Sequence, residues 1–467
     1  MAFDPINETL KGAGAENQTG AHTAPTPPLF AEHLDALKFP PASTPVRPIA
    51  GDLIRAYEAD IPQEIRNPER IVAEPIAPSH ATTFGSKSLV EFAELKRREA
   101  AKILHPAEAE YVRYGTAVSR RVERKLADLE GGEMALVFPS GMAAIEKVID
   151  ALIPNSSTQK AHFIVGTEGY RQTRNILERL VSRGWIELTV IPMGHFDRVH
   201  EHLKPNTAAV FFETPSNPYL RVIDVADVKK QVVASGTNAL VVVDHTFAGP
   251  LNQKPLEQGA DLVVPSLTKY IGGNNQVLAG AVVGSKELVL RVFELRSQSA
   301  IARDDECLRI EEGISTLSAR TELSNLNGEH VAKLLARNPN VRQLWYPGHE
   351  SHPDYQIALR QMKGFGGVVT FRLKARDFHE IAAFTDAFIA ASPKGTYIAP
   401  SFGGEFPLIS AVPIVSHFSQ TVAERKARNI PDDLVRLSVG TIHPQLLTDA
   451  LEAGFNALET AQARYDA

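Results

Sequence analysis

The chain has 467 residues, of which 43% are hydrophobic and 22% charged, an ordinary globular composition for two or three domains. Its formal net charge is −6, so the chain lacks the excess of basic residues that is typical of nucleic-acid-binding proteins. The longest apolar runs are far shorter than the roughly 20 residues of a membrane helix, and the N-terminus lacks the apolar core of a signal peptide. The single cysteine, Cys307, excludes an intrachain disulfide and a cysteine-cluster metal site. We therefore expect a cytoplasmic protein with no nucleic-acid or membrane partner.

Histidines gather in residues 195–202 and 349–352, which raises the question of a metal site. Neither segment has the pair of histidines with an internal glutamate that a helical zinc site needs. We therefore expect both segments to be surface loops and expect no metal.

Residues 1 to about 75 are rich in Pro, Gly, Asn and Thr and show no sustained period. Such a segment predicts an extended arm, partly disordered or lying along another surface. Apolar residues at helical spacing then predict one helix over 88–104 and another over 118–130, the second closed by Gly131–Gly132.

Short apolar strands then alternate with helical segments, which predicts an α/β fold whose central sheet is mostly parallel and covered on both faces. The expected strands are 134–138, 161–166, 185–191, 207–213, 239–244, 261–266 and 279–284. Ligands bind at the carboxyl ends of strands in such sheets, and Ser140, Asp244 and Ser266 all follow strand ends.

After about residue 320 the pattern changes to helices around fewer strands, which indicates a smaller C-terminal α/β domain. We expect an N-terminal arm and inter-subunit clamp over 1–118, a large cofactor-binding domain over 119–320 and a small domain over 321–467.

The most informative pair of residues is Lys269, in PSLTKYIGG, and Asp244, at the end of the apolar run ALVVVD. A lysine amine can form a Schiff base with an aldehyde cofactor. An aspartate at a strand end can hold the protonated ring nitrogen of such a cofactor. Each residue alone is more often a surface lysine or a turn aspartate. Together they indicate a pyridoxal-phosphate (PLP) site.

Further motifs accompany this pair in a fixed order along the chain. They are YVRYG (111–115), LEGGEMALVFPSGMAAI (129–145), EGYRQT (168–173), FFETPSNP (211–218) and LVRLSVG (434–440). In this order the chain resembles the Cys/Met-metabolism family of PLP enzymes, which includes cystathionine γ-synthase, cystathionine γ-lyase, methionine γ-lyase and homoserine sulfhydrylases. The resemblance runs from about Tyr111 to the C-terminus and implies the type I PLP-dependent transferase fold, like that of aspartate aminotransferase.

The turn at Ser140, Gly141 and Met142 leads from a strand into a helix, where free backbone N–H groups and the helix dipole bind phosphate. A plain strand-to-helix turn is the alternative. The resemblance implies that this turn holds the PLP phosphate, and that Ser266 and Thr268 assist the phosphate and Lys269.

Two further cofactor contacts follow from the resemblance. Tyr170 stands where the family has a tyrosine against the pyridine ring, although a core tyrosine is the alternative. Asn217 matches an asparagine near the ring hydroxyl, and Glu213 is expected to brace the site. The family commonly continues Tyr-Gly-Gly-Thr, whereas Arg171 and Gln172 stand here. Methionine γ-lyases have a cysteine in place of Gln172, and its absence here counts against that activity.

Tyr111 and Arg113 match the family's phosphate clamp, which reaches the cofactor of a neighbouring subunit. The planar fork of arginine suits a phosphate, although a solvated arginine is the alternative. We therefore expect a homo-oligomer, a dimer paired into a tetramer, whose active sites are shared.

Arg436 lies among apolar residues of a strand, and a buried arginine needs a partner. The resemblance implies that the partner is the α-carboxylate of an amino-acid substrate, with Ser401 beside it. A structural ion pair explains the pattern equally well. The chain departs from the family at two places that we expect near the substrate mouth, Glu405–Phe406–Pro407 and Asn274–Asn275–Gln276.

These parts predict γ-replacement on an activated homoserine by way of a vinylglycine-type intermediate, with Lys269 as base and Tyr170 or Tyr111 as assisting acid. The departures predict a second substrate, the nucleophile, other than cysteine. The alternatives are γ-elimination, as in cystathionine γ-lyase, sulfhydrylation of an O-acyl-homoserine, and a PLP-binding protein without catalytic activity.

Overall fold

The computed structural model describes residues 89–90, 112–154 and 159–466. The N-terminal arm, Tyr111 and most of the helix expected over 88–104 lie outside the described residues, although Leu89 and Val90 are helical. All the elements below belong to one compact unit.

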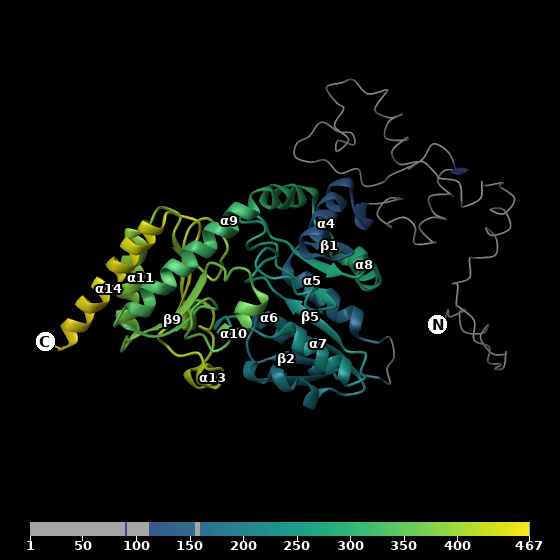
Figure 1. The fold of residues 1–467 in the computed structure, drawn as a ribbon, viewed down its shortest axis with the longest axis horizontal. Helices are drawn as coiled ribbons and strands as arrows, with labels where there is room; N and C mark the ends of the chain where they lie inside the picture. Colours follow the sequence, from purple (N-terminus) through teal and green to yellow (C-terminus); the bar gives the residue numbers. More distant parts are fainter. Residues whose placement is uncertain (1–88, 91–111, 155–158, 467) are drawn as a thin grey trace, which may run out of the picture. The chain divides into compact units, whose positions relative to one another are not determined.

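Seven strands form the first sheet, in the order β1-β7-β6-β5-β4-β2-β3 (Figure 1). The strands are β1 (Met134–Phe138), β2 (Ala161–Gly166), β3 (Ile186–Ile191), β4 (Thr207–Glu213), β5 (Leu240–Asp244), β6 (Leu262–Val263) and β7 (Gly280–Gly284). The run from β3 to β6 is parallel, and β7 is antiparallel to both its neighbours. The expectation of a mostly parallel sheet is confirmed.

Helices cover both faces of this sheet, and the central strands are apolar on both sides. In β4, Val210 and Phe212 belong to one buried core, and Ala209 and Phe211 belong to the other. The elements around the sheet are η3 (Val112–Tyr114), α4 (Ala117–Glu130), α5 (Gly141–Leu152), α6 (Arg171–Ser182), η4 (Met193–His202), α7 (Val225–Ala234) and α8 (Lys286–Ser299).

Local sequence signals set both ends of α4, and its end at Gly131 agrees with the expectation. Thr116 caps the first turn, because its hydroxyl accepts the Ser119 N–H at 3.0 Å while the Ser119 hydroxyl accepts the Thr116 N–H at 2.8 Å. Gly131 ends the helix with φ 75°, a left-handed conformation that favours glycine.

The second sheet has five strands in the order β10-β11-β12-β9-β8. They are β8 (Val341–Trp345), β9 (Val368–Leu373), β10 (Tyr397–Ile398), β11 (Leu408–Ala411) and β12 (Leu434–Ser438). The helices of this region are α9 (Asp304–Arg337), α10 (Tyr355–Gln361), α11 (Phe378–Ala391), α12 (Val412–Val415), α13 (Val422–Ala427) and α14 (Pro444–Asp466). The ring centres of Phe384 (α11) and Phe455 (α14) lie 5.0 Å apart in the apolar core beside this sheet.

Helix α9 connects the parts of the chain that carry the two sheets (Figure 1). The domain boundary expected at residue 320 falls inside this helix. Arg320 of α9 donates to the Tyr270 carbonyl at 2.5 Å and to the Ile271 carbonyl at 3.2 Å, so the helix is bonded directly to the loop that carries Lys269.

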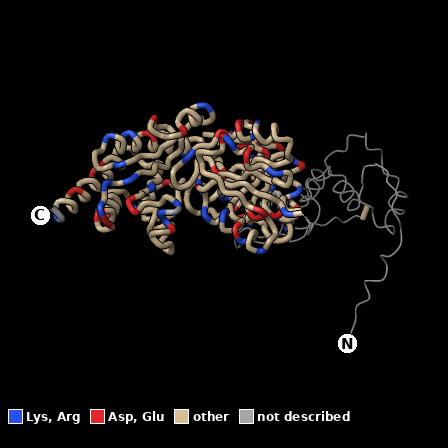
Figure 2. The backbone as a smooth tube through the Cα atoms, turned by 90° about the horizontal axis from the view of Figure 1, so that it is seen from below, with Lys and Arg blue, Asp and Glu red and all other residues tan. Residues whose placement is uncertain are grey.

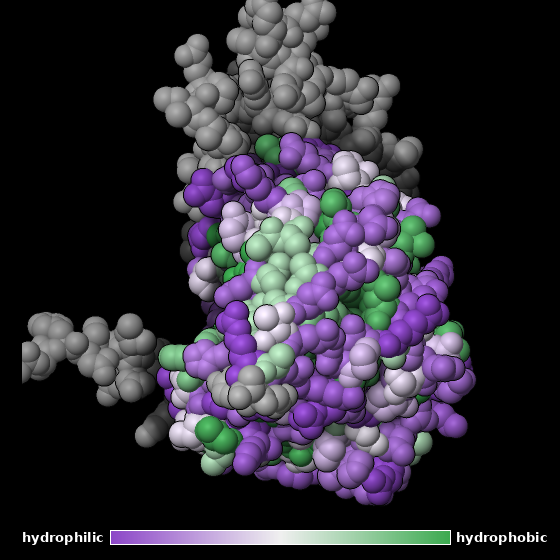
Figure 3. All heavy atoms as spheres, turned by 90° about the vertical axis from the view of Figure 1, so that its left-hand side faces the viewer, coloured by the Kyte–Doolittle hydropathy of each residue, from purple (hydrophilic) through white to green (hydrophobic). Residues whose placement is uncertain are grey.

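The surface of the described residues carries charges of both signs, distributed along the backbone in Figure 2. Hydrophilic side chains surround apolar areas of limited extent on the face shown in Figure 3. No helix in the described part of the chain combines the length and apolarity needed to span a bilayer.

Candidate functional site

One cavity of about 470 Å³ brings together most of the residues singled out from the sequence. It lies at the carboxyl ends of β1, β2, β4 and β5, and its other side is lined by Arg436 of β12 and by residues outside the strands of the second sheet. The expected site residues that line it are Ser140, Gly141, Met142, Tyr170, Asn217, Asp244, Ser266, Thr268, Lys269, Ser401 and Arg436.

The first turn of α5 forms one end of the cavity. The Ser140 hydroxyl accepts the Ala143 N–H at 3.0 Å, so by helix geometry the N–H groups of Gly141 and Met142 are left for another acceptor. A side chain does not fit here, since a Cβ on Gly141 would lie 3.2 Å from Ser266 Cβ and one on Gly280 would lie 2.5 Å from Gly141 Cα. The turn is thus a tight backbone cradle at a helix N-terminus, which suits a phosphate.

Two carboxyl groups, Glu213 and Asp244, end neighbouring parallel strands in direct register. Asp244 Oδ1 accepts the Thr246 N–H at 3.0 Å and the Thr246 hydroxyl at 2.5 Å, which leaves Oδ2 for another donor. Burial raises the pKa of Asp244 above its ordinary value, although the bonds from Thr246 oppose the shift. Burial, and then the neighbouring Asp244, raise the pKa of Glu213 well above its ordinary value. A cation placed between these groups would be strongly stabilised.

Lys269 points its amine at the Ser401 hydroxyl, which accepts a hydrogen bond at 2.8 Å. The amine also lies 5.1 Å from the ring centre of Phe402. Burial, and then the nearby Arg436 charge, lower the pKa of Lys269 to about 8. A lysine with this pKa is a far better nucleophile and base near neutral pH than a solvated one.

Arg436, in the middle of β12, is 4% exposed and reaches across to the first sheet. Its guanidinium donates to Asn217 Oδ1 at 2.8 Å and to the Pro400 carbonyl at 2.7 Å. Burial lowers its pKa to about 10. Both oxygens are neutral, and Arg436 forms no ion pair with a carboxylate of the described residues. The structural ion pair considered from the sequence is therefore absent among them.

Tyr170 is 49% exposed and lines the cavity, so it is not a core tyrosine. Its backbone N–H donates to Glu213 Oε2 at 2.9 Å. Glu213 thus braces the start of α6. Its other oxygen, Oε1, is buried without a hydrogen-bond partner among the described residues.

Arg113 is exposed and does not line this cavity. Its guanidinium donates to the Ser297 carbonyl at 3.4 Å. The structure therefore places Arg113 away from the site of its own chain, and Tyr111 lies outside the described residues.

The two departures from the family pattern, which we expect near the substrate mouth, are not among the residues that line the cavity. Phe406 packs against Gly395, and Asn275 lies against Gly404. The aromatic residue that does line the cavity is Phe402, which stacks on Phe247 with ring centres 4.0 Å apart. A sequence motif fixes the order of residues in a loop but not which of them turn inward, and here Gly403 and Gly404 redirect the chain between Phe402 and Phe406.

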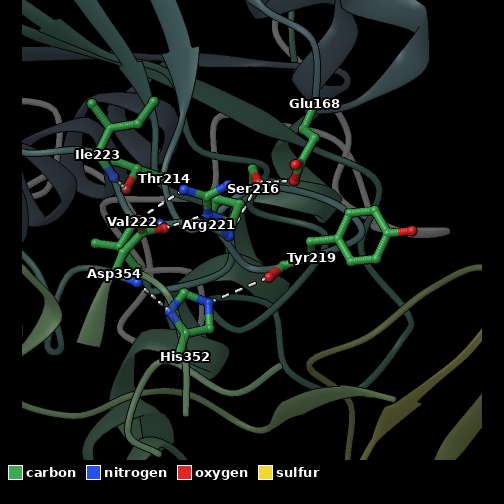
Figure 4. Close-up of polar contacts among 9 residues, drawn as sticks. All are labelled: Glu168, Thr214, Ser216, Tyr219, Arg221, Val222, Ile223, His352 and Asp354. Atoms are coloured by element: carbon green, nitrogen blue, oxygen red, sulfur yellow. Dashed lines mark hydrogen bonds and ion pairs between the residues drawn. The ribbon is translucent and has the colours of Figure 1, made fainter. Parts of the chain in front are cut away.

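A polar network fixes the loop that carries Asn217 (Figure 4). Asp354 accepts two hydrogen bonds from Arg221, at 2.6 and 2.9 Å, and one from the Val222 N–H at 2.9 Å. His352 is 3% exposed; its Nδ1 accepts the Asp354 N–H and its Nε2 donates to the Tyr219 carbonyl. The expectation that residues 349–352 form only a surface loop is therefore wrong for His352, whose polar atoms are used internally.

The same network reaches the cavity at Glu168, which sequence reasoning passed over. The Ser216 hydroxyl donates to Glu168 Oε2 at 2.7 Å (Figure 4). Burial raises the pKa of Glu168 to about 7. A carboxyl with this pKa on a cavity wall exchanges its proton near neutral pH.

Comparison with known proteins agrees with this geometry. Residues 61–456 match the family described as Cys/Met metabolism PLP-dependent enzyme. The chain belongs to that family.

Several family members resemble the chain to a similar degree. Cystathionine gamma-synthase 1, chloroplastic, from Nicotiana tabacum is 37% identical over 372 residues, or 79% of this chain and 65% of the tobacco protein. The chain thus spans slightly less than two thirds of that relative. Cystathionine beta-lyase from Lactococcus lactis is 35% identical over 74% of this chain and 89% of that protein. The cystathionine gamma synthase structure from Xanthomonas oryzae in complex with cystathionine is 29% identical, with a TM-score of 0.73 over 89% of this chain and 100% of that one. It shares the mixed first sheet and smaller second sheet, so the expected type I PLP fold is confirmed.

The residues of this family member fit PLP. The backbone cradle at Gly141 offers donors for a phosphate, and the free Oδ2 of Asp244 offers an acceptor for a ring N–H. The amine of Lys269 lines the same cavity.

One buried pair beside Asp244 could not have been found from the sequence. His245 Nε2 lies 2.9 Å from Glu130 Oε2, and both side chains are 0% exposed. Glu130 ends α4, far away in the chain, and no sequence spacing relates it to His245.

We predict that Glu168 makes the stability of the protein depend on pH. Its pKa is about 7 in the folded chain and ordinarily 4.5, so the folded state keeps a proton that the unfolded state loses. The free energy of unfolding should therefore fall by about 3 kcal/mol as the pH rises through this window, and stay level above it. Glu168→Gln keeps an acceptor for Ser216 and should remove this part of the slope. Urea unfolding of both proteins across the window, with PLP present, measures the difference; identical slopes would refute the assignment.

Proposed function

We propose that this chain is a PLP-dependent enzyme that carries out γ-replacement on an activated homoserine-like amino acid. The observation that carries the proposal is the convergence of the Lys269 amine, the Asp244 carboxyl and the Arg436 guanidinium on one cavity. These groups provide a base, an anchor for a protonated ring and a carboxylate partner. Bound PLP would supply an electron acceptor that stabilises negative charge on the substrate α-carbon.

In this proposal the backbone of Ser140, Gly141 and Met142 holds the cofactor phosphate, with Ser266 and Thr268 beside it. Thr268 is fixed for this task, since its hydroxyl donates to the Ala279 carbonyl at 3.1 Å and accepts the Ala279 N–H at 3.0 Å. Tyr170 lies against the cofactor ring, and Asn217 lies near its hydroxyl.

Lys269 acts first as the residue that carries the cofactor and then as the base that takes the proton from the substrate α-carbon. Its lowered pKa leaves an appreciable share of neutral amine near neutral pH. Ser401, 2.8 Å from the amine, orients it. Tyr170, and Tyr111 from a neighbouring subunit, are the candidates for the assisting acid.

Arg436 binds the α-carboxylate of the amino acid. Its guanidinium is buried, so a carboxylate would restore a charged partner that the described residues do not supply. Ser401, whose carbonyl lies 3.5 Å from the same guanidinium, borders this position.

A screen by mass spectrometry tests the reaction. Purified protein with PLP is given acetyl-, succinyl- or phospho-homoserine, cystathionine or methionine, each with and without thiol and carbon nucleophiles. We expect a product that joins the nucleophile to the γ-carbon of homoserine. A keto acid and ammonia formed equally with or without nucleophile would instead establish elimination. No turnover of any substrate, with PLP bound, would support a non-catalytic binding protein.

We predict that Lys269 is the residue bonded to PLP. Borohydride reduction of the protein with PLP, followed by peptide mapping, should place the label on Lys269, because its pKa of about 8 leaves a larger share of neutral amine near neutral pH than an ordinary lysine has. Lys269→Ala should lose the label, and replacement of the exposed Lys333 should not. A label on another lysine of the unchanged protein would overturn the assignment.

We propose further that two subunits share each active site, within a homotetramer built from two dimers. Arg113 is exposed and absent from the cavity of its own chain, as a residue that serves a neighbouring subunit would be. The segments 119–320 and 321–467 would form the cofactor-binding and small domains of each subunit.

Subunit mixing tests this arrangement. Arg113→Ala and Lys269→Ala subunits, each inactive alone, should regain up to about a quarter of normal activity in random mixed dimers, because one site in each hybrid keeps both residues. A mixture of two Lys269→Ala preparations is the control. Verified mixed dimers without recovered activity would contradict sharing.

A further inference from the structure

Two arginines on the cavity wall have no hydrogen-bonded or ion-paired partner among the described residues, although the charge of Arg428 acts on Glu424. Arg171 is the half-buried first residue of α6, and Arg428 follows α13 and is exposed. Neither guanidinium forms a hydrogen bond or an ion pair with any residue of 112–154 or 159–466. Arg171 stands where the family commonly has glycine.

Arg171 and Arg428 both lie close enough to His417 for their charges to act on it. His417 also lines the cavity, and its Nδ1 is 3.0 Å from Gln420 Oε1. Burial lowers the pKa of His417, and the charges of Arg171 and Arg428 lower it further. The positive charges of both guanidinium groups therefore reach the part of the cavity wall at His417.

The other cations of the cavity are already engaged. Arg436 bonds Asn217 and Pro400, Lys269 bonds Ser401, and Arg174 forms an ion pair with Glu178 at 2.7 Å. The lining acids Glu213 and Asp244 lie at the strand ends. Glu168 hydrogen-bonds Ser216 and Glu213 accepts the Tyr170 N–H, burial raises the pKa of both carboxyls, and neither forms an ion pair with Arg171.

We propose that Arg171 and Arg428 form a second anion-binding subsite, which receives a carboxylate or phosphate carried by the γ-substituent of the substrate. This inference rests on the proposed function, in which that substituent is expelled. Arg171 directly follows Tyr170, so the subsite adjoins the expected cofactor position, while Arg436 holds the α-carboxylate elsewhere in the same cavity. An amino acid with charge at both ends would then be bound at both ends.

Binding without turnover tests the subsite independently of the reaction. The visible absorbance of the protein with PLP is titrated with 2-aminoadipate, whose side chain ends in a carboxylate, and with norleucine, which has a methyl group there. We expect 2-aminoadipate to bind more tightly than norleucine. Arg171→Gln and Arg428→Gln should each weaken 2-aminoadipate roughly tenfold and leave norleucine unchanged. Arg174→Gln is the matched control, because it removes a paired charge from the same helix, and it should not change the ratio.

Kinetics identify which reactant uses the subsite. With one nucleophile, the ratio of kcat/KM for succinyl-homoserine over acetyl-homoserine should fall roughly tenfold in Arg171→Gln, mainly through KM. With one homoserine ester, nucleophiles with and without an extra carboxylate should respond alike. An effect confined to charged nucleophiles would overturn the assignment to the γ-substituent.

The two proposals can fail separately. If the protein performs no γ-replacement but prefers 2-aminoadipate through Arg171, the subsite stands and the reaction does not. If γ-replacement occurs but the double variant Arg171→Gln, Arg428→Gln binds 2-aminoadipate as tightly as the unchanged protein, the subsite is refuted.

Discussion

The guanidinium of Arg436 is the contact on which the candidate site depends. It starts from the second sheet and bonds Asn217 from the loop after β4 and Pro400 from the loop before β11. Three separate segments therefore meet at one buried planar group. Because a buried guanidinium must have its donors satisfied, the positions of these loops are coupled to each other. Phe402 reinforces the junction, since its ring lies within 5.7 Å of the guanidinium carbon and 5.1 Å of the Lys269 amine.

Burial is also the common cause of the electrostatics around the cavity. It moves the pKa of Lys269 and Arg436 down and that of Asp244, Glu213 and Glu168 up, in each case toward the neutral form. A site in this condition favours ligands that bring the missing charges. A cofactor with a phosphate and a protonated ring, and a substrate with a carboxylate, would supply them. Ligand binding would then stabilise the charged forms that burial disfavours.

The first sheet, and the grouping of polar residues from its strand ends in one cavity, could be predicted from the sequence, because continuous apolar strands and their polar ends are local patterns. Strands β10 and β11 are too short to give such a pattern. The orientation of Phe406 depends on a turn through two glycines, and the pairing of Glu130 with His245 depends on how α4 packs. Glu168 was overlooked because a single glutamate in a sequence carries no sign of its burial. These features arise from tertiary structure, which local periodicity does not encode.

Helix α9 carries a consequence for how this chain can change during evolution. Arg320 bonds the carbonyls of Tyr270 and Ile271, while Asn327 donates to the carbonyls of Gly440 and Ile442. The two residues lie on the same side of α9, two turns and about 10 Å apart. The helix therefore fixes the distance between the loop that carries Lys269 and the segment that follows β12. One inserted residue between them would turn one contact about 100° away from the other, so length can vary in the loops of this chain but not in that segment of α9.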